Sequence, residues 1–249
     1  MVQGLCEFLP VSSSGHLRLV ERLFGIQSNL LIFEIAVHLG TLLAVLVVYR
    51  QHVGNLLRGL FLGGDARRLL VMLLIATLPA AIVGPQVDDW VESLPLSAVG
   101  LSLIGTAVVL TFTRNAQHNT KRLNQVTART AFGIGLAQAL AILPGLSRSG
   151  VTITAALLAG LAPGEAASFS FLLAIPVILG AGVLGAHRFL EADQPPDLVL
   201  LLLGATTAAV VGFVTLLLVQ HILKRGRLWW FAPYCFLLGV ATILVGWRL

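Results

Sequence analysis

Long apolar stretches alternate with short polar segments along most of the chain. Six stretches are apolar over about 17 to 25 residues, which is the length of helix that crosses a hydrocarbon core of about 30 Å. They cover residues 30–49, 69–85, 96–112, 166–186, 198–220 and 229–247. The pattern therefore predicts an all-α polytopic membrane protein with six transmembrane helices.

The composition agrees with this pattern. Of the 249 residues, 57% are apolar and only 11% are charged, whereas soluble proteins carry about 25% charged residues. The mean hydropathy is +0.93. A soluble domain could not hide so much apolar surface without showing polar faces on its helices. The composition therefore argues against a soluble protein.

The net charge of +5 could suggest a nucleic-acid partner. However, the basic residues fall in short loops between apolar stretches rather than on a patch with interleaved aromatic residues. Basic loops of this kind are topology signals in membrane proteins. We therefore expect no nucleic-acid partner.

Loop charges assign a side of the membrane to each segment. Most Lys and Arg residues lie in 50–68, 114–129 and 224–227, and the positive-inside rule makes these loops cytoplasmic. The loops that face outward carry Asp88, Asp89 and Glu92, and Glu191, Asp193 and Asp197. With these sides fixed, the segment before residue 30 ends outside, and 128–164 begins and ends inside. Each of these two segments is predicted to be a re-entrant hairpin or an interfacial segment.

The same two segments resemble each other. Residues 3–16 read QGLCEFLPVSSSGH and residues 138–152 read QALAILPGLSRSGVT, so both contain a Gln, a Leu-Pro pair and an SxSG string. Leu9 aligns with Leu143 and Ser12 with Ser147, and the later spans repeat near the same offset. Each half, 1–113 and 128–249, then holds one hairpin and three spans. Because three is odd, the second half is inverted, and the polar turns of the two hairpins are expected to meet.

The first hairpin places ionisable groups in apolar surroundings. Glu7 lies four residues after Gln3, so the two share a helix face, and His16 follows on the other side of the turn. The alternative to a functional site is an interfacial Glu that reaches lipid headgroups. Three hydrogen-bonding groups around one turn favour a site.

Clustered serines follow in the same turn. Ser12, Ser13 and Ser14 lie at the start of an apolar helix, whose free N–H groups suit a phosphate, although simple N-capping would need only one serine. Ser13 is a candidate attacking hydroxyl, and His16 a candidate acid, base or nucleophile. Glu7 could activate a nucleophile or hold a divalent ion. The sequence alone does not rank these roles.

The second hairpin supplies a cation. Arg148 stands between Ser147 and Ser149 at an equivalent helix start, where its planar fork could bind two phosphate oxygens. The alternative is an Arg that extends to the cytoplasmic interface. Taken with the first hairpin, the residue set indicates phosphoryl chemistry. Glu34 and His38, four apart in the first span, are interpreted as a structural polar pair between helices.

At these residues the sequence resembles the bacterial undecaprenyl-diphosphate phosphatase family, known as bacitracin-resistance proteins. The first family motif resembles Gln3 to Glu7 followed by FLPVSSSGH, and the second, PGxSRSxxT, is present in full at 144–152. The resemblance implies hydrolysis of undecaprenyl diphosphate in the bacterial cytoplasmic (inner) membrane, which recycles the lipid carrier for cell-wall synthesis. It also implies dependence on a divalent cation, Mg²⁺ or Ca²⁺, contact with membrane lipids, and allows a homodimer.

The resemblance also assigns roles to residues. By position, the catalytic set is Glu7, Ser13, His16 and Arg148, with Glu7 also the candidate metal ligand; the substrate contacts are Gln3, Ser12, Ser147, Ser149 and Thr152. The identity of the nucleophile stays open. Gln3 replaces a Glu that the family often has, which removes one candidate base or metal ligand. Because Met1 lies almost directly before the first motif, we expect the natural chain to begin with a further apolar segment.

Two other functions fit the same architecture. Inverted repeats with broken helices are typical of transporters, so a polyprenyl-phosphate flippase is the main alternative. A lipid-binding protein without catalytic activity, or one that sequesters bacitracin, is the second.

Overall fold

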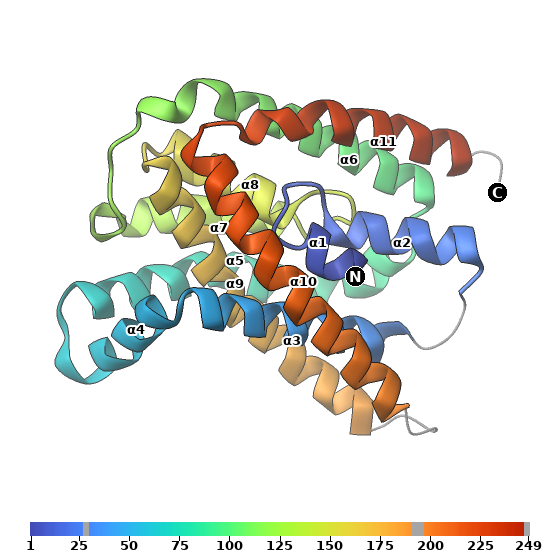
Figure 1. The fold of residues 1–249 in the computed structure, drawn as a ribbon, viewed down its shortest axis with the longest axis horizontal. Helices are drawn as coiled ribbons and strands as arrows, with labels where there is room; N and C mark the ends of the chain where they lie inside the picture. Colours follow the sequence, from blue (N-terminus) through green and yellow to red (C-terminus); the bar gives the residue numbers. More distant parts are fainter. Residues whose placement is uncertain (27–29, 191–196, 247–249) are drawn as a thin grey trace.

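The protein is built from helices and the loops that connect them (Figure 1). The computed structural model describes residues 1–26, 30–190 and 197–246. Within this described part no β-strand forms, and an isolated bridge joins Lys121 to Leu161. The helices are α1 Val2–Cys6, α2 Ser13–Phe24, α3 Leu30–Val48, α4 Arg50–Leu62, α5 Gly64–Glu92, α6 Leu96–Thr111, η1 Phe112–His118, η2 Leu123–Gln125, α7 Ala128–Leu140, α8 Arg148–Leu158, α9 Pro163–Leu190, α10 Leu198–Lys224, η3 Leu228–Phe231 and α11 Ala232–Gly246. The predicted all-α class is confirmed.

Several of these helices are long and apolar enough to cross a membrane. In the described ranges five segments qualify, namely Gly64–Glu92, Leu96–Arg114, Pro163–Val183, Leu198–Lys224 and Leu228–Gly246. A sixth span results if α3 and α4 count as one, but these two helices bend by 84° at their junction. A multi-pass membrane protein is therefore confirmed. The finer layout of six spans plus two re-entrant hairpins stays a prediction.

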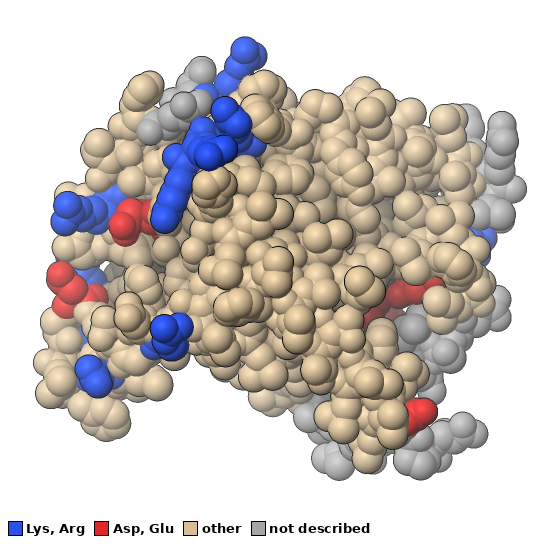
Figure 2. All heavy atoms as spheres, in the orientation of Figure 1, with Lys and Arg blue, Asp and Glu red and all other residues tan. Residues whose placement is uncertain are grey.

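Basic side chains gather at one end of the molecule. In Figure 2 most Lys and Arg spheres lie at the end where Figure 1 places α4 and the C-terminal end of α10. This clustering is what the positive-inside rule requires of a cytoplasmic end. The predicted end of the last span, Trp247, and the acidic positions Glu191 and Asp193 lie outside the described residues.

Close backbone contact joins the long helices in pairs, with α3 packed on α10, α5 on α7 and α6 on α11. At the last of these crossings two glycines face each other. A Cβ added to Gly100 would lie 2.6 Å from the carbonyl oxygen of Gly239, and one added to Gly239 would lie 2.6 Å from that of Gly100. Small residues permit such approach, which brings the dispersion contacts that hold membrane helices together.

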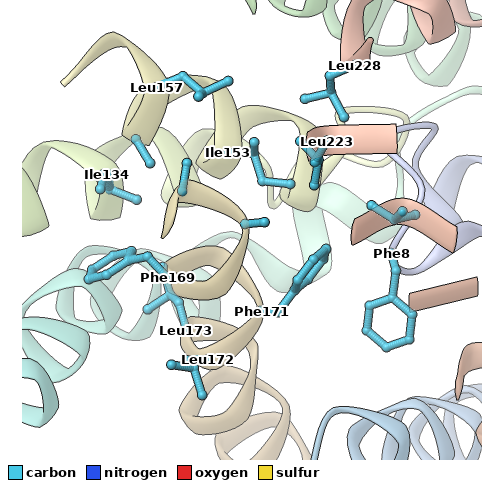
Figure 3. Packing of buried hydrophobic residues seen from close by; sticks show 14 of the residues in the cluster. Phe8, Ile134, Ile153, Leu157, Phe169, Phe171, Leu172, Leu173, Leu223 and Leu228 are labelled. Atoms are coloured by element: carbon cyan, nitrogen blue, oxygen red, sulfur yellow. The ribbon is translucent and has the colours of Figure 1, made fainter. Parts of the chain in front are cut away.

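A buried apolar cluster surrounds α9 and extends to both polar hairpins (Figure 3). Phe169, Leu172 and Leu173 of α9 are fully buried in it. Phe8, which directly follows Glu7, is 1% exposed, and its ring meets that of Phe171 edge to face at 5.7 Å. This packing fixes the backbone beside the first polar turn.

The two hairpins, α1–α2 and α7–α8, touch each other. A Cβ on Gly15 would lie 2.9 Å from the Cα of Gly145, so only a residue without a side chain allows this approach. The Ser149 hydroxyl donates a hydrogen bond to the Leu9 carbonyl at 3.2 Å. The two polar turns therefore meet, as the repeated motif predicts. The division into inverted halves 1–113 and 128–249 stays a prediction.

Candidate active site

Glu7 lies at the end of α1, where the chain turns away from the helix. Its side chain is almost fully buried, at 6% exposure for the residue. Gln3, one helical turn earlier, donates from Nε2 to Glu7 Oε2 at 2.9 Å, as the four-residue spacing predicts. A buried carboxylate needs such partners because desolvation is costly.

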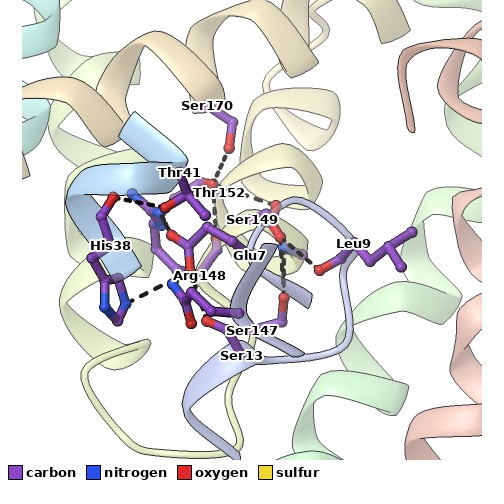
Figure 4. Close-up of polar contacts among 12 residues, drawn as sticks. Glu7, Leu9, Ser13, His38, Thr41, Ser147, Arg148, Ser149, Thr152 and Ser170 are labelled. Carbon is purple, nitrogen blue, oxygen red and sulfur yellow. Dashed lines mark hydrogen bonds and ion pairs between the residues drawn. The ribbon is translucent and has the colours of Figure 1, made fainter. Parts of the chain in front are cut away.

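Ser13 directly faces this carboxylate (Figure 4). Its hydroxyl donates to Glu7 Oε2 at 2.7 Å, although the two residues lie on opposite sides of the turn. A hydroxyl hydrogen-bonded to a general base is the arrangement that activates a nucleophile. The geometry therefore pairs Ser13 with Glu7 among the candidate reacting groups.

Arg148 reaches the same carboxylate from the other hairpin. It is the first residue of α8, and its Nη2 forms an ion pair with Glu7 Oε1. Its Nη1 is buried and has no hydrogen-bond partner among the described residues. A buried guanidinium nitrogen without a partner leaves a strong donor free for an anion such as a phosphate oxygen.

Ser12 and Ser147 cap the two helices whose starts meet at the site. The Ser12 hydroxyl accepts from the Gly15 N–H at 3.3 Å, and the Ser147 hydroxyl accepts from the Gly150 N–H at 3.1 Å. The N-capping alternative therefore applies to both serines. Ser12 also has a φ of 68°, which no other described residue apart from glycines shows as a positive value. Such strained backbone tends to persist at functional sites.

The hydroxyls of Ser149 and Thr152 hold α8 in place. The Ser149 Oγ lies 3.2 Å from the Ser147 Oγ and also donates to the first hairpin. Thr152 is fully buried, donates to the Arg148 carbonyl at 2.8 Å and lies 2.5 Å from the Ser170 Oγ of α9. These contacts fix the position of Arg148. Phosphate contacts by Ser12, Ser147, Ser149 and Thr152 stay predictions.

His16 belongs to a neighbouring part of the site. Its Nδ1 lies 2.8 Å from the Ser12 carbonyl oxygen, and its Nε2 lies 2.7 Å from the hydroxyl of Tyr234 in α11. In the described structure its hydrogen bonds therefore go to these two groups and not to Glu7. The planes of the His16 and Tyr234 rings are nearly parallel, with an angle of 11° between them.

The structure adds Tyr234, which the sequence interpretation missed, and gives His38 a contact with the site that was not expected. The His38 Nε2 lies 3.7 Å from Glu7 Oε2, and its Nδ1 lies 2.7 Å from the backbone carbonyl oxygen of Glu34. The interpretation of Glu34 and His38 as a structural pair is therefore incomplete, because the imidazole also faces the site. The only sequence signal for this contact of His38 was the presence of a histidine within an apolar span.

The donor set around Glu7 does not fit a resident divalent ion. In the described ranges no three His, Cys, Asp or Glu side chains converge as metal ligands. The two Glu7 oxygens already contact a guanidinium, a hydroxyl and an amide. Mg²⁺ can instead be held by one carboxylate together with substrate phosphates. An ion therefore fits this site only together with a phosphate ligand.

Comparison with known proteins gives consistent matches over the whole chain. The family described as "Bacitracin resistance protein BacA" matches residues 1–241. A protein from Desulfosudis oleivorans named undecaprenyl-diphosphatase is 44% identical over 266 residues, which cover 100% of this chain and 96% of its own length. Proteins of the same name from Carboxydothermus hydrogenoformans and Bacteroides fragilis are 40% and 41% identical, each over 98% of this chain and 94% and 95% of their own lengths.

Proposed function

The chain belongs to the bacitracin resistance protein BacA family, and from this premise we propose how its site acts. The protein hydrolyses undecaprenyl diphosphate to undecaprenyl phosphate and inorganic phosphate, the activity named for its relatives. One observation carries the assignment of residues. The Ser13 hydroxyl is hydrogen-bonded to Glu7, whose other oxygen is paired with Arg148.

In the first step Ser13 attacks the terminal phosphorus. A bond forms between its Oγ and the phosphorus, and the hydroxyl proton passes to Glu7 Oε2, 2.7 Å away. The bond from phosphorus to the bridging oxygen breaks, and its electron pair stays on undecaprenyl phosphate, which leaves. A positioned carboxylate base contributes about 10²- to 10⁴-fold to such a step.

In the second step water releases phosphate from Ser13. The water oxygen bonds to phosphorus and loses a proton to Nε2 of His16, while Ser13 Oγ departs and regains a proton from Glu7. The imidazole is suited to this role because its Nδ1 bonds the Ser12 carbonyl, so Nε2 is the nitrogen that can accept a proton once water displaces the Tyr234 hydroxyl from it. The protonated His16 then passes its extra proton to the departing phosphate or to water, which restores the enzyme, so atoms and protons balance over the cycle.

Charge on the transferred phosphoryl group is stabilised by fixed donors. Arg148 offers its free Nη1, and the N-termini of α2 and α8 contribute the partial positive charge of their helix dipoles. Because these donors come from both hairpins, the site needs the two hairpins to meet.

We also propose that a divalent cation, Mg²⁺ or Ca²⁺, enters with the substrate diphosphate, with Glu7 as its protein carboxylate. Held there, such a cation would neutralise phosphate charge, which favours binding of a polyanion. We further propose that the protein lies in the bacterial cytoplasmic membrane, surrounded by lipid, and that it forms a homodimer. Titration of the rate with a chelator tests the need for a divalent cation, and cross-linking in native membranes tests the homodimer.

The experiment that tests the function measures phosphate release from undecaprenyl diphosphate by the full chain in detergent with divalent cation. Hydrolysis predicts stoichiometric phosphate and undecaprenyl phosphate. A folded protein that releases no phosphate but moves the lipid across vesicles would instead be a flippase. If the folded protein neither releases phosphate nor moves the lipid, it is a lipid-binding protein without catalytic activity.

A further inference from the structure

Tyr234 brings a residue from the last helix to the site. Its hydroxyl lies 2.7 Å from His16 Nε2, a contact that spans 218 positions of sequence. The ring centroids are 5.8 Å apart with nearly parallel planes, so the two rings meet through their polar edges. The contact therefore directs the tyrosine hydroxyl at the one imidazole nitrogen that the backbone leaves available.

Hydrogen-bond chemistry fixes the proton positions in this contact. A carbonyl oxygen can only accept, so the Nδ1 that lies 2.8 Å from the Ser12 carbonyl carries the hydrogen. In the neutral imidazole Nε2 is then an acceptor, and the Tyr234 hydroxyl donates to it. Ser12 accepts through a backbone held at a φ of 68°, so the turn itself orients the ring. Tyr234 and Ser12 hold the imidazole from its two ends.

The hydroxyl is not required for helix packing. Tyr234 is 47% exposed, and α11 packs on α6 through Gly239 and Gly100. The hydroxyl instead makes its hydrogen bond with His16 of the first hairpin.

We infer that Tyr234 is a positioning residue of the hydrolytic site, which acts through His16 by fixing the tautomer and the direction of its Nε2. This inference rests on the proposed function for its kinetic consequence. In the substrate-free protein the hydroxyl occupies Nε2. When substrate and water enter, the water takes the place of the hydroxyl at Nε2, on a ring whose tautomer and direction this contact has already set.

A double-mutant cycle separates this role from a structural one. Tyr234→Phe is expected to lower kcat for phosphate release about 10-fold with KM unchanged, because general-base action is impaired. In a His16→Ala background the same substitution is expected to change kcat by less than about twofold, because its route of action is gone. Tyr49→Phe, which loses a hydroxyl bonded to Gln220, is the matched control and is expected to keep kcat.

Two kinetic outcomes would overturn the inference. One is a wild-type kcat in folded Tyr234→Phe. The other is an equal loss of kcat when Tyr234→Phe is made in the wild type and in His16→Ala, which is the result expected of a structural role.

Nitrogen NMR of the His16 ring gives a readout that does not depend on activity. The His16 signals are assigned as those that disappear in His16→Ala. The spectrum is expected to show the Nδ1-protonated tautomer, with an Nε2 shift that changes in Tyr234→Phe. An Nε2-protonated ring, or an unchanged shift, would refute the inference. If the wild type releases no phosphate, the proposed function fails, whereas this spectrum still decides the placement of Tyr234.

Discussion

The Ser13 hydroxyl donates to Glu7 Oε2 at 2.7 Å across a turn that separates two short helices. The contact does not follow from the period of one helix, because α1 ends before Glu7 and α2 begins at Ser13. It depends on the intervening turn, which Phe8 anchors in the apolar cluster. The reacting pair is thus a product of tertiary packing.

Glu7→Gln tests the carboxylate as the base. The amide keeps nearly the same shape but cannot accept the Ser13 proton, so kcat for phosphate release is expected to fall by about 10²- to 10⁴-fold. Glu165→Gln is the matched control, because Glu165 of α9 accepts from the Leu123 N–H of η2 and not from a candidate site residue. Comparable rates in the two variants would exclude Glu7 as the base.

Arg148→Lys tests the guanidinium fork. Lys keeps the charge but lacks the planar fork whose two separate nitrogens can face Glu7 and a phosphate oxygen, so KM is expected to rise about 10-fold or more. Arg68→Lys, which affects a contact with the Val126 carbonyl, should leave KM unchanged. Steady-state phosphate release over a range of lipid concentrations measures both. An unchanged KM in Arg148→Lys would mean that the free Nη1 does not hold the substrate.

His38→Ala tests the imidazole that lies 3.7 Å from Glu7. Its loss removes a polar neighbour of a buried carboxylate and is expected to lower kcat about 10-fold, which is less than the loss of about 10²- to 10⁴-fold expected for the base itself. His52→Ala, on α4, serves as the control. Equal rates in the two variants would restore the purely structural interpretation of His38.

The contact between α6 and α11 predicts an effect on stability. Gly239→Val places side-chain atoms where even a Cβ meets the Gly100 oxygen at 2.6 Å. Overpacking of this kind costs about 1 to 3 kcal/mol, so the Tm in detergent should fall by about 5 °C. Gly84→Ala is the control, because a Cβ added to Gly84 would lie 4.0 Å from Ile142 Cδ1, an ordinary contact distance. A Tm for Gly239→Val that matches the control would show that the two helices are not tightly packed.

Much of this arrangement can be predicted from local sequence. Apolar stretches give the helices, and the repeated Leu-Pro and SxSG strings show that two hairpins meet, which brings Glu7 beside Arg148. The bend of 84° between α3 and α4 falls at Tyr49, where the predicted span ends and the basic segment 50–68 begins. The sequence predicts a loop there, and the helix α4 could not be predicted from apolar length because this segment is not continuously apolar.

The contacts of His38 and Tyr234 could not be predicted either. Each joins segments distant in the chain, and their partners depend on how α3 and α11 pack against the first hairpin. Sequence periodicity reports which face of a helix is apolar, but not which distant residue that face meets.

The initial rate of phosphate release by Ser13→Ala tests the central claim most directly. Ser93→Ala, which removes a hydroxyl bonded to the Trp90 carbonyl in an exposed loop, is the matched control. If Ser13 is the nucleophile, its variant should lose about 10³-fold or more in rate while eluting as a folded protein. Terminal-phosphate label should appear on Ser13 of acid-quenched wild type and be missing in the variant. A rate for Ser13→Ala equal to that of Ser93→Ala, with no label on the wild-type serine, would contradict the account.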